Sequence, residues 1–391
     1  MSIAADSTVN PALRVAVIGA GYWGPNLARN FAMSSDWELV AICDMDRERA
    51  EELARKTGEP AVVTSVDELL AEHEVDAVAI ATPARTHHAI AMQAIAAGKH
   101  VVVEKPLADT TERGREMVEA ARAAGTVLMA DHTYCYTPAV LKIRELIASG
   151  ELGEILYVDS VRINLGLVQP DVDVFWDLAP HDLSILDFIL PGGLEPVAVS
   201  AQGADPLRSG KSCVGYLALP LPNGALAHVH VNWLSPTKIR QMVIGGSKKT
   251  LVWDDLNPQQ RLSIFDRGVD LGRQEQVYGD AASRKGAAIS YRLGDTWSPA
   301  LSEFEPLGLM VTSFAEAIRT DQPAPTDGDS ALRVLAVLEA ASASLAAGGA
   351  KKQVGQAGPS ALAGPAAHSA LSAPSALTPS THPDSTLEAA L

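Results

Sequence analysis

The sequence predicts an α/β protein. A doubly wound parallel sheet occupies the first third of the chain, and a second, α+β domain with an open, largely antiparallel sheet follows. Three observations favour this fold class. Short apolar runs alternate with helical segments as far as about Asp131, and longer strand-like segments with turn signals come after them. The 391 residues also exceed what one ordinary core holds.

Six apolar runs in the first third are predicted to be strands. They are rich in Val and Ile without alternation, which indicates strands buried on both faces of a parallel sheet. Segments between them, such as "RERAEELARKTG", have helical spacing and end near a glycine. The runs are "RVAVIG" from Arg14, "ELVAICD" ending at Asp44, "AVVT" from Ala61, "DAVAIAT" from Asp76, "HVVVEKP" from His100 and "TVLMAD" from Thr126.

The pattern changes in the second domain. A helix is predicted from Pro138 to Ala148, and another from Ser330 to about Leu345. Between them, long segments such as "CVGYLALPLPNGALAHVHVNWLS" contain turn signals between strands. We divide the chain into a flexible N-terminus (1–12), a first domain (13–135), a second domain (136–349) and an Ala/Pro/Ser-rich tail (350–391), expected to be disordered.

The composition, with 47% hydrophobic and 20% charged residues, suits a soluble globular protein. A net charge of −16 argues against general nucleic-acid binding, which needs a basic face. The three cysteines show no metal or disulfide spacing. The first residues lack a secretory signal pattern, and no apolar run approaches the roughly 20 residues of a membrane helix. We therefore expect a cytoplasmic protein without nucleic-acid or membrane partners.

The stretch "GAGYWG" stands where the first predicted strand passes into a helix. In such a turn the first glycine permits the tight bend, the second lets the backbone approach a pyrophosphate, and the third lets the helix pack closely on the strand. N–H groups at the helix start then face the phosphates. Gly19, Gly21 and Gly24 are therefore predicted to bind a dinucleotide. The alternative is a glycine turn used only for packing.

Asp44 indicates which dinucleotide is bound. It ends the second predicted strand, 20 residues after Gly24. An acid at this place hydrogen-bonds the adenosine ribose hydroxyls and repels a 2′-phosphate, so NAD is favoured over NADP. Arg47 and Arg49 lie nearby; they could soften this preference or be solvated helix residues.

Catalytic residues are expected at the carboxyl ends of the parallel strands. "VVVEKP" places Glu104 and Lys105 at one such end, and Lys105 is a candidate for handling a hydroxyl proton. The alternative is an ion pair between the two. In "WDLAPHDL", Asp177 and His181 are four residues apart and share one helix face, with Pro180 suited to the helix start. They form a candidate proton-transfer pair, or else a helix cap and a satisfied histidine.

Other histidines are weaker candidates. His87 and His88 follow the fourth strand, and we expect one to face the cofactor and the other to lie on a helix surface. His228 and His230 share a strand face with Asn232, but no further ligand is evident. No metal site is therefore predicted.

The motifs occur together in chain order: "GAGYWG" after a strand, "ATP" with His87 four residues past Pro83, "EKP", and the Asp177-to-His181 pair. In this combination the chain resembles the glucose–fructose oxidoreductase/inositol dehydrogenase/rhizopine catabolism (Gfo/Idh/MocA) family over residues 12 to about 349. The resemblance implies a Rossmann domain followed by an open-sheet domain. It also implies that the sheets pair between subunits, giving homodimers or homotetramers.

The resemblance implies roles for single residues. Lys105 would lie beside the nicotinamide, and His181 would be the acid/base, with Asp177 supporting it. The residues near the cofactor would include Tyr22, Trp23, Thr82, Pro83, His87, Glu104 and Trp176.

Within the family, stretches such as "VRINLGLVQPDVDVFWDLAPHDLSIL" look closest to the nucleotide-sugar dehydrogenase and ketoreductase branch. Arg162 and Asn164 project from one strand face, which suits a polar substrate or merely caps the exposed side of the sheet. In this branch they would lie on the substrate side, together with Lys105 and His181.

The predicted activity is hydride transfer between a nicotinamide cofactor and a hydroxyl or ketone of a sugar ring, at C3 of a nucleotide-linked sugar. His181 would take the proton, and Lys105 would stabilise the charge developing on oxygen. Three alternatives stay open: a dehydrogenase of free polyols such as inositols, an NAD-dependent glycosidase, and a non-catalytic NAD-sensing module.

Overall fold

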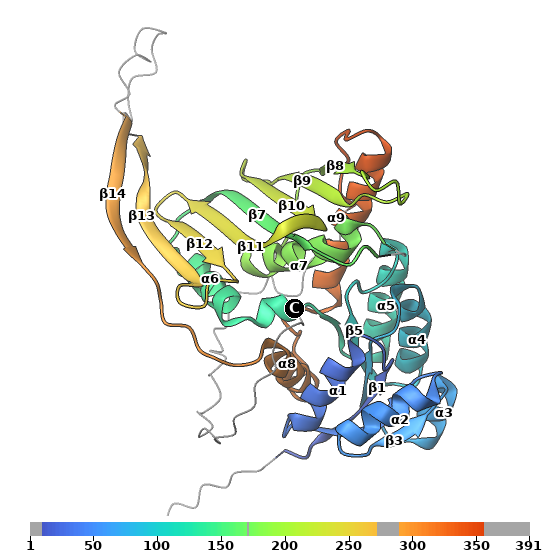
Figure 1. Ribbon diagram of the computed structural model, residues 1–391. Coiled ribbons are helices and arrows are strands. Elements are labelled where there is room, and N and C mark those ends of the chain that lie inside the picture. Colours follow the sequence, from blue (N-terminus) through green and yellow to red (C-terminus); the bar gives the residue numbers. More distant parts are fainter. Residues whose placement is uncertain (1–9, 170–171, 272–288, 356–391) are drawn as a thin grey trace, which may run out of the picture.

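The computed structural model describes residues 10–169, 172–271 and 289–355 (Figure 1). The segments predicted to be flexible, 1–12 and 350–391, fall for the most part outside these residues. No helix within the described residues is long and apolar enough to cross a membrane.

The first domain alternates strands and helices: β1 (Leu13–Ile18), α1 (Gly24–Met33), β2 (Trp37–Cys43), α2 (Arg47–Lys56), β3 (Ala61–Val63), α3 (Val66–Glu72), β4 (Ala77–Ile80), α4 (Ala84–Ala96), β5 (His100–Glu104), α5 (Thr111–Ala124), β6 (Leu128–Asp131) and the short 3₁₀ helix η1 (Thr133–Tyr136). The strands form a parallel sheet in the order β3-β2-β1-β4-β5-β6. Helices α1 and α2 pack on one face, and α3, α4 and α5 pack on the other. The predicted doubly wound sheet is confirmed.

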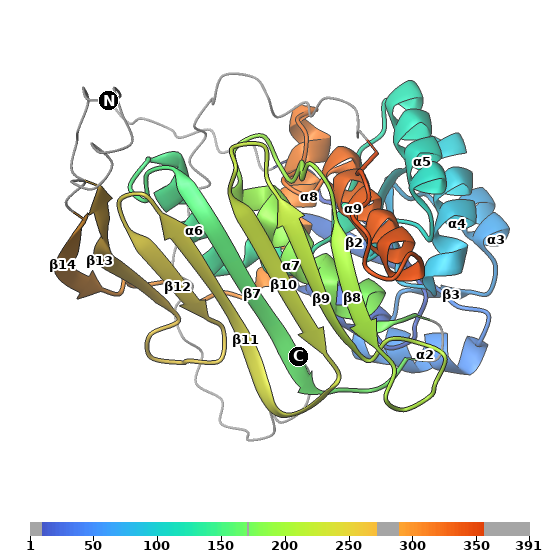
Figure 2. The same ribbon diagram turned by 90° about the horizontal axis from the view of Figure 1, so that it is seen from above.

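The second domain contains α6 (Pro138–Ala148), β7 (Ile155–Leu165), α7 (Val174–Ile189), β8 (Ser200–Ala204), β9 (Val214–Pro220), β10 (Leu226–Asn232), β11 (Leu234–Gly246), β12 (Thr250–Asp254), β13 (Leu262–Leu271), β14 (Ile289–Trp297), α8 (Pro306–Thr320) and α9 (Gly328–Ala346). Its eight strands run β14-β13-β12-β11-β7-β10-β9-β8, and the pair β7/β10 is parallel while the other pairs are antiparallel. Figure 2 shows the described helices behind one face of this sheet and the other face uncovered. The largely antiparallel open sheet is confirmed.

Helix α7 begins earlier than predicted. Its N-cap is Asp173, whose Oδ1 accepts the N–H groups of Phe175 (3.0 Å) and Trp176 (3.1 Å). A side chain that satisfies the first free N–H groups decides where a helix starts. Pro180 therefore lies inside the helix, and the expectation that it marks the start is wrong. Asp177 and His181 are nevertheless one turn apart on the same helix, as predicted.

The two C-terminal helices pack back onto the first domain. Helix α8 lies against α1, and α9 lies against both α5 and α7. The indole N–H of Trp37 donates to the Val311 carbonyl of α8 (2.8 Å), and its ring stacks on Phe314 (centroids 5.3 Å apart). These contacts hold α8 and α9 on the first domain, and α7 reaches the carboxyl end of β5 through Asp177, which contacts Lys105.

Candidate active site

The glycine turn has the geometry that a dinucleotide needs. Gly19 has φ +102°, and a Cβ there would lie 2.7 Å from the Ala81 carbonyl oxygen. A Cβ on Gly24 would collide with the carbonyl oxygen of Gly19. Gly21, in contrast, would place its Cβ in open space, with nothing within 4 Å. Gly19 and Gly24 are thus required by the fold itself, and Gly21 leaves the backbone accessible to a pyrophosphate.

Asp44 lies directly after β2, beside this turn. Its Oδ2 accepts the N–H of Ala20 (2.7 Å), and its Oδ1 accepts the N–H of Asp46 (2.9 Å). The Arg49 Nη1 lies 3.9 Å from the Asp44 Oδ1, whereas its Nη2 lies 3.1 Å from the Oδ2 of Asp46, three residues earlier. A carboxylate held on the glycine turn fits an adenosine ribose with two free hydroxyls. The turn and this carboxylate together fit NAD.

Lys105 and Asp177 meet where β5 ends. The Lys105 Nζ donates to the main-chain oxygen of Asp177 (3.0 Å) and lies 3.3 Å from its Oδ1. The other carboxylate oxygen, Oδ2, accepts the indole N–H of Trp233 (3.0 Å). The Lys105 and Asp177 side chains are 17% and 21% exposed, so water and small molecules reach the pair. The alternative ion pair between Glu104 and Lys105 is replaced by one between Lys105 and Asp177.

His181 lies one turn after Asp177, and its ring meets the ring of Tyr134 edge-on (centroids 5.0 Å apart). Burial lowers the pKa of His181 well below its ordinary value of 6.5, and the positive charges of Lys105 and Arg162 lower it further. The imidazole is therefore neutral at pH 7 and ready to accept a proton.

Arg162 is held in a buried cluster beside Tyr134. Its Nε and Nη2 donate to the two carboxylate oxygens of Asp182 (2.8 and 3.1 Å), and Ser160 donates to the same carboxylate (2.9 Å). The guanidinium also lies over the Tyr134 ring, 4.3 Å from its centroid. Its hydrogen-bonding edge is thus taken by Asp182. Asn164 lies two residues further along β7 and is half-buried.

The residues expected near the cofactor form contacts that shape the surrounding loops. The His87 ring nitrogens lie 2.9 Å from the Pro106 oxygen and 2.7 Å from the Thr82 oxygen, so this ring joins the loops after β4 and β5. His88 pairs with Glu116 at the surface, as expected of one of the two histidines. Pro83 is the N-cap residue of α4.

The aromatic residues of this group are placed differently from one another. Trp23 donates its indole N–H to Asp131 at the end of β6 (2.6 Å), and Trp176 donates to Ser342 of α9 (2.9 Å). Tyr22 is 87% exposed at the glycine turn. Trp23 and Trp176 thus brace the region around the carboxyl ends of the strands, while Tyr22 is free to contact a ligand.

Sequence reasoning missed four side chains in this region. Tyr134 follows "TVLMAD" and lies just past the carboxyl end of β6, a position that the rule for open sheets would have marked. Asp182 is buried beside His181, and a buried carboxylate on a helix requires a cation such as Arg162. Trp233 and Arg240 lie on strands far along the chain, and no local pattern singles them out.

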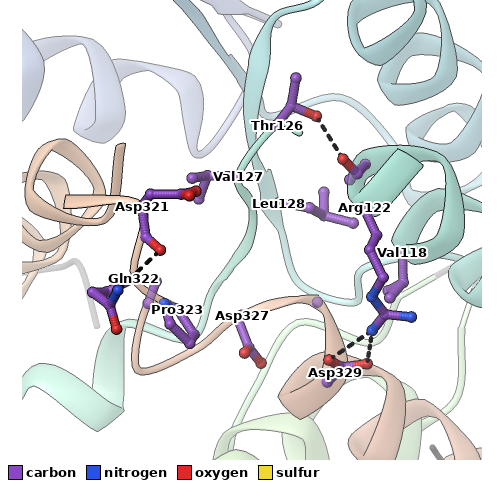
Figure 3. Close-up of a pocket in the computed structure, with 13 residues that line it drawn as sticks. Val118, Arg122, Thr126, Val127, Leu128, Asp321, Gln322, Pro323, Asp327 and Asp329 are labelled. Carbon is purple, nitrogen blue, oxygen red and sulfur yellow. Dashed lines mark hydrogen bonds and ion pairs between the residues drawn. The ribbon is translucent and has the colours of Figure 1, made fainter. Parts of the chain in front are cut away.

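A separate hollow lies between α5, β6 and the segment joining α8 to α9 (Figure 3). Arg122 and Asp329 form an ion pair across it (3.2 Å). None of the predicted site residues lines this hollow. Within the described residues, no three His, Cys, Asp or Glu side chains are grouped to hold a metal ion.

Comparisons with known proteins match both domains. A family model described as "Oxidoreductase family, NAD-binding Rossmann fold" matches residues 13–132, and "GFO/IDH/MocA C-terminal domain" matches residues 140–252. UDP-N-acetylglucosamine 3-dehydrogenase of Acidithiobacillus ferrooxidans is 32% identical over 83% of this chain and 94% of its own length. The solved structure of that dehydrogenase, GnnA, has a TM-score of 0.71 at 28% identity and covers 86% of this chain and 98% of its own.

Two further relatives are similar over different lengths. D-glucoside 3-dehydrogenase of Escherichia coli is 38% identical over 51% of this chain and 60% of its own length. GenD2 from gentamicin A biosynthesis, solved in complex with NAD, has a TM-score of 0.73 at 25% identity and covers 90% of this chain and 98% of its own. Together with the matches on both domains, these similarities show that the chain belongs to the GFO/IDH/MocA oxidoreductase family and has its NAD-binding Rossmann fold.

Proposed function

We propose that this enzyme transfers hydride between NAD and C3 of a nucleotide-linked sugar. The observation that carries the proposal is the meeting of Lys105, Asp177 and His181 at the carboxyl edge of the parallel sheet, where a nicotinamide enzyme acts. The names of two relatives, UDP-N-acetylglucosamine 3-dehydrogenase and D-glucoside 3-dehydrogenase, support C3 as the reacting carbon. The Asp44 carboxylate supports NAD rather than NADP.

Each residue of the proposed site has a distinct task. Bound NAD supplies the hydride acceptor. The neutral His181 imidazole takes the proton of the sugar hydroxyl. The Lys105 ammonium donates a hydrogen bond to the same oxygen and stabilises its developing negative charge. Asp177 holds Lys105, and Trp233 holds Asp177. Reduction of a keto-sugar uses the same groups in reverse.

The nucleotide half of the substrate requires cations for its diphosphate, and Arg240 is suitably placed. Arg240 is the register partner of Arg162 on the adjacent strand, and its guanidinium lies 5.8 Å from the centroid of the Tyr134 ring. Its contact with Asp255 is long (3.7 Å), which leaves donors for a phosphate. Because Arg162 is bonded to Asp182, we assign it to positioning Tyr134 and His181, and we assign Arg240 and Asn164 to the substrate side.

Nicotinamide absorbance tests the proposal. The enzyme is mixed with NAD or NADP and with a panel of UDP-sugars, dTDP-sugars and free inositols. Reduction of NAD by one nucleotide sugar is the expected result. Reduction by inositols alone would contradict the substrate class and favour a polyol dehydrogenase. If nothing reacts, two further assays follow: oxidation of NADH by keto-sugars, and release of sugar without net formation of NADH. Inactivity in both assays would favour the non-catalytic sensing module.

We also propose that the uncovered face of the second sheet pairs two copies of the chain. Tyr157, Tyr216 and Leu226 lie on this face and are 39%, 44% and 48% exposed. Tyr216 stacks on His230 of the neighbouring strand (centroids 4.4 Å apart). Exposed aromatic and aliphatic side chains on one flat face are typical of an interface. Sedimentation should show a dimer or tetramer, and Tyr216→Glu should shift it toward the monomer; a monomeric wild type would contradict the pairing.

A further inference from the structure

Glu104 lies in the site region, and its carboxyl group is incompletely satisfied. It ends β5, directly before Lys105, and its Oε2 atom is buried without a hydrogen-bond partner among the described residues. The Lys105 ammonium does not pair directly with this carboxyl group, because its Nζ donates to Asp177 instead. A carboxyl group with one oxygen buried and unpaired is costly as an anion and less costly as a neutral acid.

Two carboxylates near Glu104 oppose its ionisation, and one cation favours it. Asp131 is its register partner on β6, and Asp177 faces it from α7; Lys105 is the cation nearby. Burial raises the pKa of Asp131, although this carboxyl group accepts hydrogen bonds from Trp23 (2.6 Å) and Thr133 (2.5 Å), which favour its charged form. Burial above all, and then the two carboxylates, raise the pKa of Glu104 to about 8 against the opposing effect of Lys105.

The position of Glu104 relates this carboxyl group to the nicotinamide. In an open parallel sheet the dinucleotide lies across the point where the strand order reverses, which here is between β1 and β4. Asp44, after β2, marks the adenosine side. The nicotinamide half is therefore expected over the ends of β4 and β5, where Glu104 and Lys105 lie. The nicotinamide ring is positively charged in NAD⁺ and neutral in NADH.

We propose that Glu104 carries a proton in the free enzyme and releases it to solvent when NAD⁺ binds, whereas NADH leaves the proton in place. The carboxylate then serves as counter-ion to the oxidised ring. One O–H bond breaks, the proton goes to buffer, and no electrons are transferred. This inference requires the nicotinamide site alone and is independent of which sugar reacts.

Titration calorimetry in two buffers of different ionisation enthalpy measures the proton directly. At pH 7, NAD⁺ should release most of one proton per site, because the pKa of Glu104 in the free enzyme lies above 7, and NADH should release close to none. The affinity for NAD⁺ should rise up to about tenfold per pH unit below pH 8, and the affinity for NADH should stay flat. Equal proton counts for the two cofactors would overturn the proposal.

Glu104→Gln should abolish the release and make NAD⁺ binding independent of pH. The matched control is Glu116→Gln, a surface carboxylate that pairs with His88 and should leave the release intact. Release that persists in Glu104→Gln would assign the proton to Lys105 or Asp131 and overturn the proposal. If that variant does not fold, difference infrared spectra of the wild type decide. The C=O band of a protonated carboxyl group should disappear on adding NAD⁺ and stay on adding NADH, and a band unchanged by NAD⁺ would overturn the proposal.

Discussion

Helix α7 carries a paired carboxylate near each end, and the two pairs differ in how completely they are satisfied. Near the start, the Asp177 Oδ1 lies 3.3 Å from the Lys105 Nζ, and the Oδ2 accepts the indole N–H of Trp233 (3.0 Å). The Lys105 and Asp177 side chains are both partly exposed. Near the end, Asp187 accepts bonds from Arg333 (2.5 and 2.8 Å) and from Ser330 (2.6 Å). The Asp187 and Arg333 side chains are 2% and 3% exposed.

The difference separates an ion pair that stabilises the fold from one that can do chemistry. Arg333 reaches Asp187 through two donors in a fixed geometry, and both side chains are almost fully buried, so a ligand does not reach the pair. The Lys105 ammonium has three donors, and a reacting oxygen can take one of them without breaking the fold. Four predictions, most of them with a matched variant, test this comparison from the largest expected effect to the smallest.

Asp187→Asn should destabilise the protein most, because it leaves the Arg333 guanidinium buried without its counter-ion. The expected loss is about 3–5 kcal/mol of unfolding free energy, measured by urea denaturation. Asp177→Asn is the matched variant and should cost about 1 kcal/mol or less, since that pair is partly exposed. Equal losses would show that the two pairs do not differ as described.

Lys105→Ala should reduce turnover by about 10²–10³-fold, the effect of removing one charged donor to a developing oxyanion. The unfolding free energy and the affinity for the cofactor should change little. Nicotinamide fluorescence measures the affinity for NADH, and calorimetry measures the affinity for NAD. Full activity of this variant on the true substrate would rule out the proposed role.

The pH dependence of sugar oxidation should follow His181. Because the pKa of His181 lies well below 6.5, the base is neutral at pH 7 and kcat/KM should be level there at saturating NAD. As the pH falls through that lowered pKa, His181 becomes protonated and kcat/KM should drop by about tenfold per unit. His181→Asn should remove this acid limb, and His88→Asn should keep it. An acid limb at or above pH 6.5 would contradict the assignment.

Trp233→Phe should have the smallest effect. It removes the N–H bonded to the Asp177 Oδ2, worth about 1 kcal/mol, and so should lower kcat several-fold through the misplaced Lys105. Trp253→Phe is the control, since its buried indole nitrogen has no partner among the described residues. A loss of kcat in both variants alike would point to packing rather than to this hydrogen bond.

Much of the fold could be predicted because its signals are local. The strand before Gly19 and the acid after β2 are read within a few residues, as is the helix from Pro138 to Ala148, which begins and ends as predicted. The sequence analysis does not predict helix α8. The apolar face of this helix packs against Trp37, which lies more than 270 residues earlier in the chain. Its position therefore depends on tertiary packing that no window of sequence contains.

The candidate site divides in the same way. Lys105, Asp177 and His181 belong to short motifs and could be named, and the structure brings them together. Their partners could not be named from the sequence. Trp233 lies 56 residues after Asp177 in the chain, and Asp182 and Arg162 lie on different elements. The resemblance predicts Arg162 on the substrate side. Alternation along a strand indicates the face of its side chain, but not that Asp182 accepts from its guanidinium.

The packing of α8 on the first domain limits how this chain can be divided into fragments that fold. Trp37 lies between Phe31 of its own domain (centroids 5.1 Å apart) and Phe314 of α8 (5.3 Å). A fragment ending after the first sheet would expose this aromatic layer to water. Chimaeras that exchange the cofactor-binding domain between relatives should therefore carry the α8 that matches this domain. This helix can be supplied as a separate peptide or joined by circular permutation. The unit to exchange is thus larger than the contiguous Rossmann segment.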